Sequence, residues 1–186
     1  MTSVFVAGSR KIGRINEQVR ERLENVIAGS YQVLVGDANG ADKAVQSYLW
    51  ERGYQHVVVY CSGPKCRNNL GGWPIHNVSV PSDKRGRNFY TCKDIEMASN
   101  ADYGLMIWDG RSAGTISNVM ELLKRGKKAL VYLSPKRSFF TIVSLNDADE
   151  LLANCSSADL KKIVKKVNLN RKFKEVSQSS QHALDF

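Results

Sequence analysis

Three short segments of the chain combine glycine with hydroxyl, acidic and basic residues in a pattern that suits phosphate binding. Each follows a run of apolar residues and precedes a segment with helical spacing. Glycine lets backbone N–H groups approach an anion closely, and a helix N-terminus adds unpaired N–H groups and a partial positive charge. The three turns are Gly8-Ser9-Arg10, Gly36-Asp37-Ala38-Asn39-Gly40-Ala41-Asp42 and Asp109-Gly110-Arg111-Ser112-Ala113-Gly114-Thr115.

Side chains within these turns could also bind a phosphate directly. Ser9, Ser112 and Thr115 carry hydroxyl donors, and Arg10 and Arg111 could clamp phosphate oxygens. We predict the following ligand-binding residues: Gly8, Ser9, Arg10, Gly36, Asp37, Gly40, Ala41, Arg87, Asp109, Gly110, Ser112, Gly114 and Thr115.

The turns differ from the two best-known nucleotide-binding motifs. None reads G-x-G-x-x-G and none reads G-x-x-x-x-G-K-[ST], which argues against an ordinary dinucleotide dehydrogenase or an NTPase. A glycine-containing turn after a strand is structural in any α/β protein, so one turn alone identifies no site. Two or three turns at the same edge of one sheet favour a ligand site.

Carboxylates in and near the turns are candidates for catalysis. Cleavage of an N-glycosidic bond needs a carboxylate beside an oxocarbenium-like sugar, and we choose Asp109 and Asp42 as the catalytic candidates, with Asp37 and Asp94 behind them. Each has a simpler interpretation. Asp109 precedes Gly110 as a turn former, Asp42 is an acid in the first turn of a helix, and Asp94 is a solvated residue in mid-helix.

Three further residues have both a ligand-binding and a structural interpretation. Arg87 opens a helix after a glycine-containing loop, where it could reach a phosphate or serve as a surface cation. Tyr90 and Trp108 could stack on a base, although core packing is the usual role of such a tryptophan.

The cysteines and histidines indicate no metal centre. Cys61, Cys66 and Cys92 lie near His76, but the sequence contains no C-x-x-C pair and no paired histidines. We therefore predict ordinary cysteines that stay reduced in a cytoplasmic protein, and no metal. The start of the chain shows no export signal, and no apolar run is long enough for a membrane helix.

The order of apolar and amphipathic segments predicts a Rossmann-like α/β domain. Five or six strands alternate with helices, which is typical of βαβ units and a mainly parallel sheet covered on both faces. The expected strands are 2–7, 32–35, 56–61, 103–108, 128–133 and 139–143, with a short one around 77–80 in the long loop 62–86. The expected helices are 16–28, 41–51, 87–99, 115–125, 146–153 and 157–167.

The chain of 186 residues is expected to form one main domain, residues 1–145, followed by a basic helical segment, 146–176, and a frayed tail, 177–186. The formal net charge is +9, and much of the excess lies in 65–87 and 159–174. Basic residues attract phosphate of any kind, so the charge alone does not separate free nucleotides from DNA or RNA. A nucleic-acid-binding module that uses the basic helix is one alternative, and a solvated basic helix is another.

The same segments resemble the SLOG superfamily, and within it the small YspA-like proteins. The resemblance covers about Val4–Leu133 and rests on Gly8-Ser9-Arg10, on Gly36 with Gly40-Ala41-Asp42, on Arg87-Asn88 and on Asp109-Gly110 with Gly114-Thr115. The superfamily includes the Lonely Guy phosphoribohydrolases, the DNA-processing protein A and nucleotide-sensing domains of bacterial conflict systems. The resemblance implies a Rossmann-like fold that binds a nucleotide or a nucleotide-derived ligand, and by analogy a homodimer.

One residue departs from the enzymes of that superfamily. Lonely Guy enzymes carry P-G-G-x-G-T-x-x-E, whose glutamate serves N-glycosidic cleavage, and this chain has Asn118 at the place of the glutamate. Glu121 lies one turn further along the helix and is no simple substitute. The leading hypothesis is therefore a nucleotide-binding protein, acting as a sensor or in nucleotide processing. A nucleoside 5′-monophosphate N-glycosidase is the enzymatic alternative.

Overall fold

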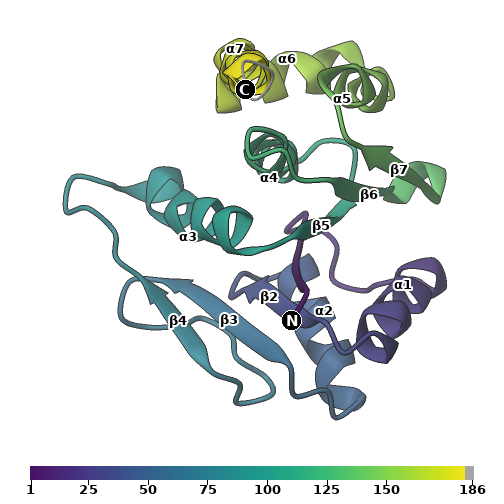
Figure 1. Cartoon of the computed structure of the whole chain (residues 1–186), viewed down its shortest axis with the longest axis vertical. Coiled ribbons are helices and arrows are strands. Elements are labelled where there is room, and N and C mark those ends of the chain that lie inside the picture. The colour runs from purple at the N-terminus through teal and green to yellow at the C-terminus, as the bar shows by residue number, and fades with distance from the viewer. Residues whose placement is uncertain (183–186) are drawn as a thin grey trace.

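The computed structural model describes residues 1–182, except for the side chains of Arg87 and of residues 180–182. It is an α/β protein built around one seven-stranded sheet (Figure 1). The strands are β1 (Ser3–Gly8), β2 (Gln32–Gly36), β3 (Val57–Ser62), β4 (Ile75–Val78), β5 (Tyr103–Trp108), β6 (Ala129–Leu133) and β7 (Ser138–Ile142). The helices are α1 (Glu17–Ala28), α2 (Ala41–Glu51), α3 (Gly86–Asn100), α4 (Ala113–Leu123), α5 (Leu145–Leu152), α6 (Ser157–Val167) and α7 (Leu169–His182), with a 3₁₀ turn, η1 (Ser134–Lys136).

The strand order is β4-β3-β2-β1-β5-β6-β7, and the neighbouring strands are parallel except β6 and β7. The predicted Rossmann-like class is confirmed, with more strands than the five or six expected. β7 is antiparallel because η1 and Arg137, whose φ is 49°, reverse the chain within a few residues. The sheet extends from β1 in both directions, so the connections leave β1 and β5 toward opposite edges.

Alternating residues of the strands pack against helices on the two faces of the sheet. On β1, Phe5 and Ala7 join the core beneath α3 and α4, whereas Val4 and Val6 join the core beneath α1 and α2. Both cores are built from buried apolar side chains, as a parallel sheet covered on both faces requires. The sheet is therefore a rigid platform from which the turns at its carboxyl edge project.

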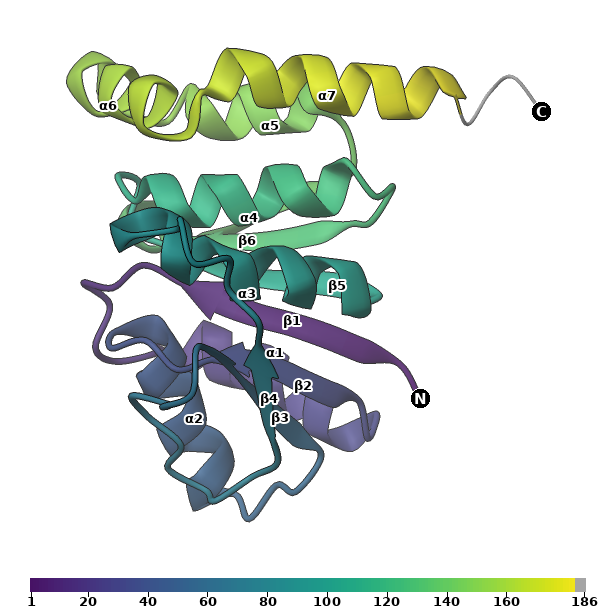
Figure 2. The same cartoon turned by 90° about the vertical axis from the view of Figure 1, so that its left-hand side faces the viewer.

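The C-terminal helices form an additional layer over α4 (Figure 2). Ile163 and Val167 of α6 and Val176 of α7 belong to the same core as α4, so this basic segment is packed onto the main domain. α7 continues through Ser177 to His182, so the first part of the expected tail is helical in the structure, and residues 183–186 lie outside the described part.

The expected helix 157–167 coincides with α6, and Ser156 caps it through its side chain. The helix expected from 146 begins one residue earlier, at Leu145, because Ser144 caps α5 through a reciprocal capping box with Asp147. Within residues 1–182, no helix has the length and apolar character that crossing a membrane requires.

The structure corrects the prediction that all the cysteines are reduced. Cys61 and Cys66 form a disulfide, with their Cα atoms 5.3 Å apart, while Cys92 and Cys155 are free. The chain reverses after β3 through Gly63, whose φ is 79°, and this turn brings the two cysteines together. Proximity created by a turn is hard to read from a spacing of five residues, which is why the pairing was missed.

Candidate functional site

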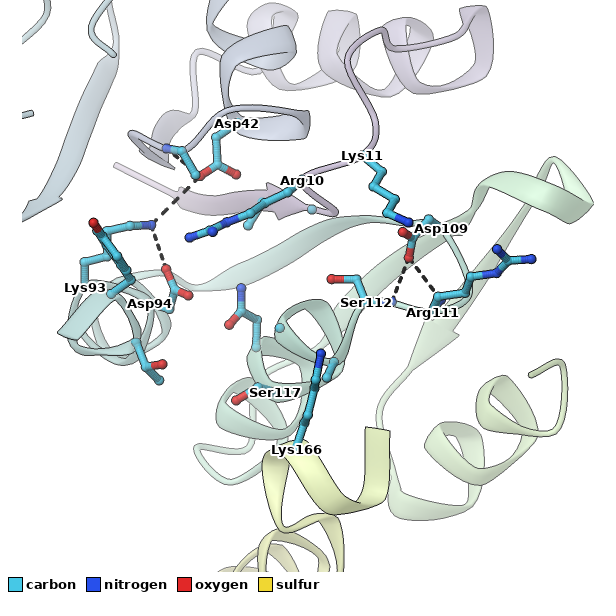
Figure 3. A pocket seen from close by; sticks show the side chains of 18 of the residues that line it. Arg10, Lys11, Asp42, Lys93, Asp94, Asp109, Arg111, Ser112, Ser117 and Lys166 are labelled. Atoms are coloured by element: carbon cyan, nitrogen blue, oxygen red, sulfur yellow. Dashed lines mark hydrogen bonds and ion pairs between the residues drawn. The ribbon is translucent and has the colours of Figure 1, made fainter. Parts of the chain in front are cut away.

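A pocket of about 690 Å³ opens at the carboxyl ends of β1 and β5 (Figure 3). These two strands are neighbours, and the chain leaves them toward opposite edges of the sheet, so the pocket lies at the topological switch point where α/β proteins bind ligands. Its volume lies within the range of roughly 300–1,000 Å³ that is typical of ligand sites. The lining comes from the β1–α1, β2–α2, β3–β4 and β5–α4 connections together with α2, α3, α4 and α6.

Ser9 joins the three predicted turns to one another. Its backbone N–H donates to Ile107 O at 2.9 Å, and its carbonyl accepts from the N–H of Ala41 at 3.2 Å. Its hydroxyl accepts from the N–H of Asp109 at 3.0 Å and lies 3.4 Å from Thr115 Oγ1. The turns therefore converge as predicted, but Ser9 and Thr115 are buried beneath the pocket and position it instead of lining it.

Close packing between the turns explains two of their glycines. A Cβ at Gly8 would lie closer than 3.0 Å to Ile107 O and to Ala41 Cβ. A Cβ at Gly40, whose φ is +87°, would lie equally close to the backbone of Arg10. Gly40 and Ala41 therefore serve the packing of the turns and do not line the pocket, whereas Gly8 does both.

The N-terminus of α4 is open toward the pocket. Asp109 Oδ1 accepts from the N–H groups of Arg111 at 3.0 Å and Ser112 at 2.7 Å, so this carboxylate shapes the turn. Ser112 is the N-cap but makes no capping bond through its side chain. The next two residues, Ala113 and Gly114, line the pocket, and their N–H groups have no partner among the described residues. Backbone donors left in this way at a helix start can bind an anion.

A buried ion cluster closes the opposite end of the pocket, on α3. Lys93 Nζ lies 2.7 Å from Asp94 Oδ1 and 3.9 Å from Asp42 Oδ2, and the lysine is only 3% exposed. Burial raises the pKa of Asp42 to about 6, although Lys93 pulls it down. Burial also lowers the pKa of Lys93, but the carboxylates of Asp94 and Asp42 outweigh it, and the lysine pKa lies above its ordinary value.

Gly36 makes room for this cluster. A Cβ at Gly36 would lie closer than 3.0 Å to Asp42 Oδ2 and to Lys93 Nζ. The glycine is therefore required by the ion cluster behind it. Gly36 does not line this pocket, and its role in binding a ligand stays a prediction.

Asp37 also has a structural role. Its carboxylate, which is 2% exposed, accepts from the backbone N–H, Nε and Nη2 of Arg67. Burial raises the pKa of Asp37, but the hydrogen bonds from Arg67 outweigh it and lower the pKa overall. Arg67 itself lines the pocket, with its guanidinium 4.2 Å from the centre of the Tyr90 ring, and Arg10 lies 5.6 Å from the same ring.

Two buried polar side chains of α4 face the pocket without a protein partner. Ser117 and Asn118 are 4% and 5% exposed, and both line the pocket. Neither side chain is hydrogen-bonded to another described residue, yet the buried side-chain atom without a partner in the described part is Ser62 Oγ. The polar atoms of Ser117 and Asn118 are therefore open to the pocket, where a bound molecule or water can pair with them.

The predicted site residues fall into two groups. Those that line the pocket are Gly8, Arg10, Asp42, Asp109, Ser112 and Gly114. Those that lie outside its lining are Ser9, Gly36, Asp37, Gly40, Ala41, Gly110 and Thr115. Arg87 belongs to α3, but its side chain lies outside the described part of the structure. The second group lies outside the lining because a glycine, hydroxyl or acidic residue in a turn can pack against a neighbouring segment as easily as against a ligand.

Sequence reasoning named Tyr90 but missed several other lining residues, Lys93 among them. Lys93 lies on one face of α3 with Tyr90 and Met97, at spacings of three and four, and a lysine among apolar positions is a sequence signal of a buried charge. No local signal marks Lys11 and Arg67, or Lys162 and Lys166 of α6, as pocket residues. In the described residues, no group of three His, Cys, Asp or Glu side chains is arranged to hold a metal ion.

No protein-family model matches this chain, and no curated protein matches it significantly. The resemblance of its turns to the SLOG superfamily therefore stays a prediction. The homodimer inferred from that resemblance, and the cytoplasmic location, stay predictions as well.

Proposed function

We propose that the pocket binds a nucleotide or a nucleotide-derived ligand, with the phosphate of the ligand at the N-terminus of α4. The observation that carries this proposal is the open helix start at Ala113 and Gly114, facing a pocket with unpartnered polar groups on the same helix. The resemblance of the turns to nucleotide-binding proteins supports a nucleotide over a simpler anion.

Basic side chains around the helix start favour the same ligand. Lys11 and Arg111 extend on either side of Asp109, and Lys166 of α6 reaches into the pocket from below (Figure 3). Lys162 also lines the pocket. A ring of cations strengthens the binding of a phosphate beyond what backbone N–H groups provide, and its contribution weakens as salt rises. Lys162 and Lys166 of α6 thus line the pocket, which favours a small phosphate ligand over a nucleic acid bound by the basic helix.

Substitution of Gly114 separates the ligand site from the fold. A Cβ at Gly114 would meet no protein atom nearer than Ser112 Oγ at 3.9 Å, so Gly114→Ala should keep or slightly raise the thermal stability, because alanine favours a helix. The added methyl group occupies the space where a phosphate would contact the helix start. We expect nucleotide affinity to fall by about tenfold for Gly114→Ala and further for Gly114→Val, since a phosphate would lose charge-assisted hydrogen bonds to backbone N–H groups.

The measurement is a calorimetric titration with nucleoside 5′-monophosphates, alongside a thermal melt of each variant. Gly13→Ala is the matched control, because a Cβ at Gly13 meets no atom within 4 Å and Gly13 does not line the pocket. Failure of every phosphate-bearing nucleoside to bind the unmodified protein, or equal binding by the Gly114→Val protein, would contradict the proposal.

A second candidate function is hydrolysis of the N-glycosidic bond of a nucleoside 5′-monophosphate to ribose 5-phosphate and free base. It is favoured by the two carboxyl groups, Asp42 and Asp94, on either side of Lys93 in one pocket. With its pKa raised to about 6, Asp42 is partly protonated near neutral pH and could donate that proton to the departing base. Asn118 carries no charge and could not replace a catalytic glutamate, and Asp109 is engaged in its turn.

Release of free base measures this activity directly. Incubation with AMP, GMP, CMP and their deoxy forms, followed by chromatography, should show base whose rate of release increases as the pH falls toward 6, because Asp42 must be protonated to act. Asp42→Asn should remove the activity, whereas Asp149→Asn, which changes an exposed acid of α5, should not. Absence of free base at high protein concentration would leave nucleotide binding as the function and reject the hydrolase.

A further inference from the structure

The two ends of the pocket differ in charge. At the α4 end, the helix start adds partial positive charge to Lys11, Arg111 and Lys162, and the acids there are Asp109 and Asp159. At the α3 end, the three cations Arg10, Arg67 and Lys93 are balanced by Asp37, Asp42 and Asp94. An anionic group is therefore favoured at the α4 end, and a neutral polar group is favoured at the α3 end.

Asp94 presents an acceptor to that neutral group. Its Oδ1 accepts from Lys93, and no other donor among the described side chains reaches its carboxylate, which lines the pocket and is about one quarter exposed. Lys93 is buried and fixed between two carboxylates, so it holds Asp94 in place (Figure 3). A carboxylate in this position accepts hydrogen bonds and repels phosphate, so the ligand must bring an O–H or N–H donor to it.

The buried polar groups of α4 lie at a suitable distance from the helix start. Asn118 follows Gly114 by four residues, so it lies on the same face of the helix about 6 Å further along the axis. A nucleoside 5′-monophosphate has its sugar hydroxyls within a comparable distance of its phosphate. Ser117 and Asn118 can both donate and accept, and Asp94 only accepts, which together match a pair of neighbouring hydroxyl groups.

We propose that Asp94, held by Lys93 and assisted by Asn118, binds the 2′- and 3′-hydroxyls of a ribose, so that the pocket selects ribonucleotides over deoxyribonucleotides. The inference rests on the proposed nucleotide binding and adds the orientation of the ligand and the part of it that is recognised. Asp94 acts here as a specificity-determining residue, and Lys93 as a positioning residue.

The experiment compares the dissociation constants of ribonucleoside 5′-monophosphates with those of their 2′-deoxy counterparts, and of AMP with 3′-deoxy-AMP. A hydrogen bond to a charged group supports a preference of about 10- to 100-fold for the ribose form in the unmodified protein. In Asp94→Asn, the ratio should fall to within about threefold of unity, through weaker binding of the ribose form. Asp149→Asn is the control with an unchanged ratio, because Asp149 is exposed on α5 and does not line the pocket.

The outcomes separate the two proposals. If no nucleotide binds, the proposed function fails and the inference fails with it. If ribose and deoxyribose forms bind equally well to the unmodified protein, nucleotide binding stands and the inference is rejected, even if Asp94→Asn does not fold. If the unmodified protein prefers the ribose form strongly and Asp94→Asn keeps that preference, a residue other than Asp94 recognises the sugar and the inference is rejected. Weaker binding of IMP than of AMP, without a preference for ribose, would assign Asp94 to an amino group of the base and would also overturn the inference.

Discussion

Replacement of Lys93 by methionine is expected to lower the free energy of unfolding at pH 8 by about 3–5 kcal/mol, because removal of one partner leaves buried carboxylates without their counter-charge. Lys93 is the only cation within 4 Å of Asp42 in the described part of the structure, and that carboxyl is itself nearly inaccessible to solvent. Methionine keeps the length and apolar character of the lysine stem, so the decrease in the free energy of unfolding reports the loss of the charge more than a loss of packing. Urea unfolding of both proteins gives the difference.

The loss of stability in Lys93→Met should depend on pH, and the titration of Asp42 determines the direction of that dependence. The pKa of Asp42 in the folded protein is about 6, above its ordinary value of 3.8, so its protonation stabilises the fold fully below pH 3.8, and this stabilisation is lost as pH rises through 6. Without Lys93 the pKa of Asp42 rises further, since the lysine was lowering it. The cost of Lys93→Met should therefore be smallest near pH 5 and largest at pH 8.

The exposed residue Lys128 provides the control, because Lys128→Met changes a surface charge and should alter stability by less than about 0.5 kcal/mol. A deficit of Lys93→Met that stays constant between pH 5 and pH 8 would show that lost packing, rather than the ion cluster, causes it.

Replacement of Gly36 by alanine should cost about 2–3 kcal/mol of stability, although alanine adds a single methyl group. The new Cβ would overlap the positions of Asp42 Oδ2 and Lys93 Nζ, and a buried ion pair cannot move apart without leaving its charges poorly compensated. The melting temperature of Gly36→Ala should fall by several degrees. Gly13→Ala, whose Cβ would meet no atom within 4 Å, should have the melting temperature of the unmodified protein.

A tolerated Gly36→Ala would mean that Lys93 and Asp42 do not pack against the end of β2 as described. The same variant should also weaken nucleotide binding at the α3 end of the pocket, because Asp94 would lose the fixed position of Lys93. Gly36 would then influence the ligand without contacting it.

Local patterns in the sequence were sufficient to predict the fold class. Apolar runs such as Val4-Phe5-Val6-Ala7, each followed by a glycine turn and an amphipathic helix, predict βαβ units because burial of both sheet faces and short right-handed connections leave few other arrangements. The convergence of the three turns followed from the same rule, since carboxyl ends of parallel strands share one edge. β7 was predicted as a strand, but its antiparallel direction depends on the reversal at Arg137.

The roles of individual residues at the turns could not be predicted in the same way. Ser9, Asp37 and Thr115 have the residue types of ligand-binding groups, yet Ser9 and Thr115 join the turns and Asp37 binds Arg67. A hydroxyl or carboxylate is equally suited to a ligand and to a neighbouring backbone. Which of them it meets depends on distances between segments far apart in the sequence.

The sequence by itself determined a Rossmann-like sheet and a glycine-rich edge suited to an anion, because both follow from local periodicity and from the conformational freedom of glycine. Only the tertiary structure decided which groups surround the pocket. It placed β1 beside β5, brought Lys162 and Lys166 of α6 over α4, and buried Lys93 between Asp42 and Asp94. The physical reason is that charges interact through space, and their burial and partners are set by packing between segments that no local spacing relates.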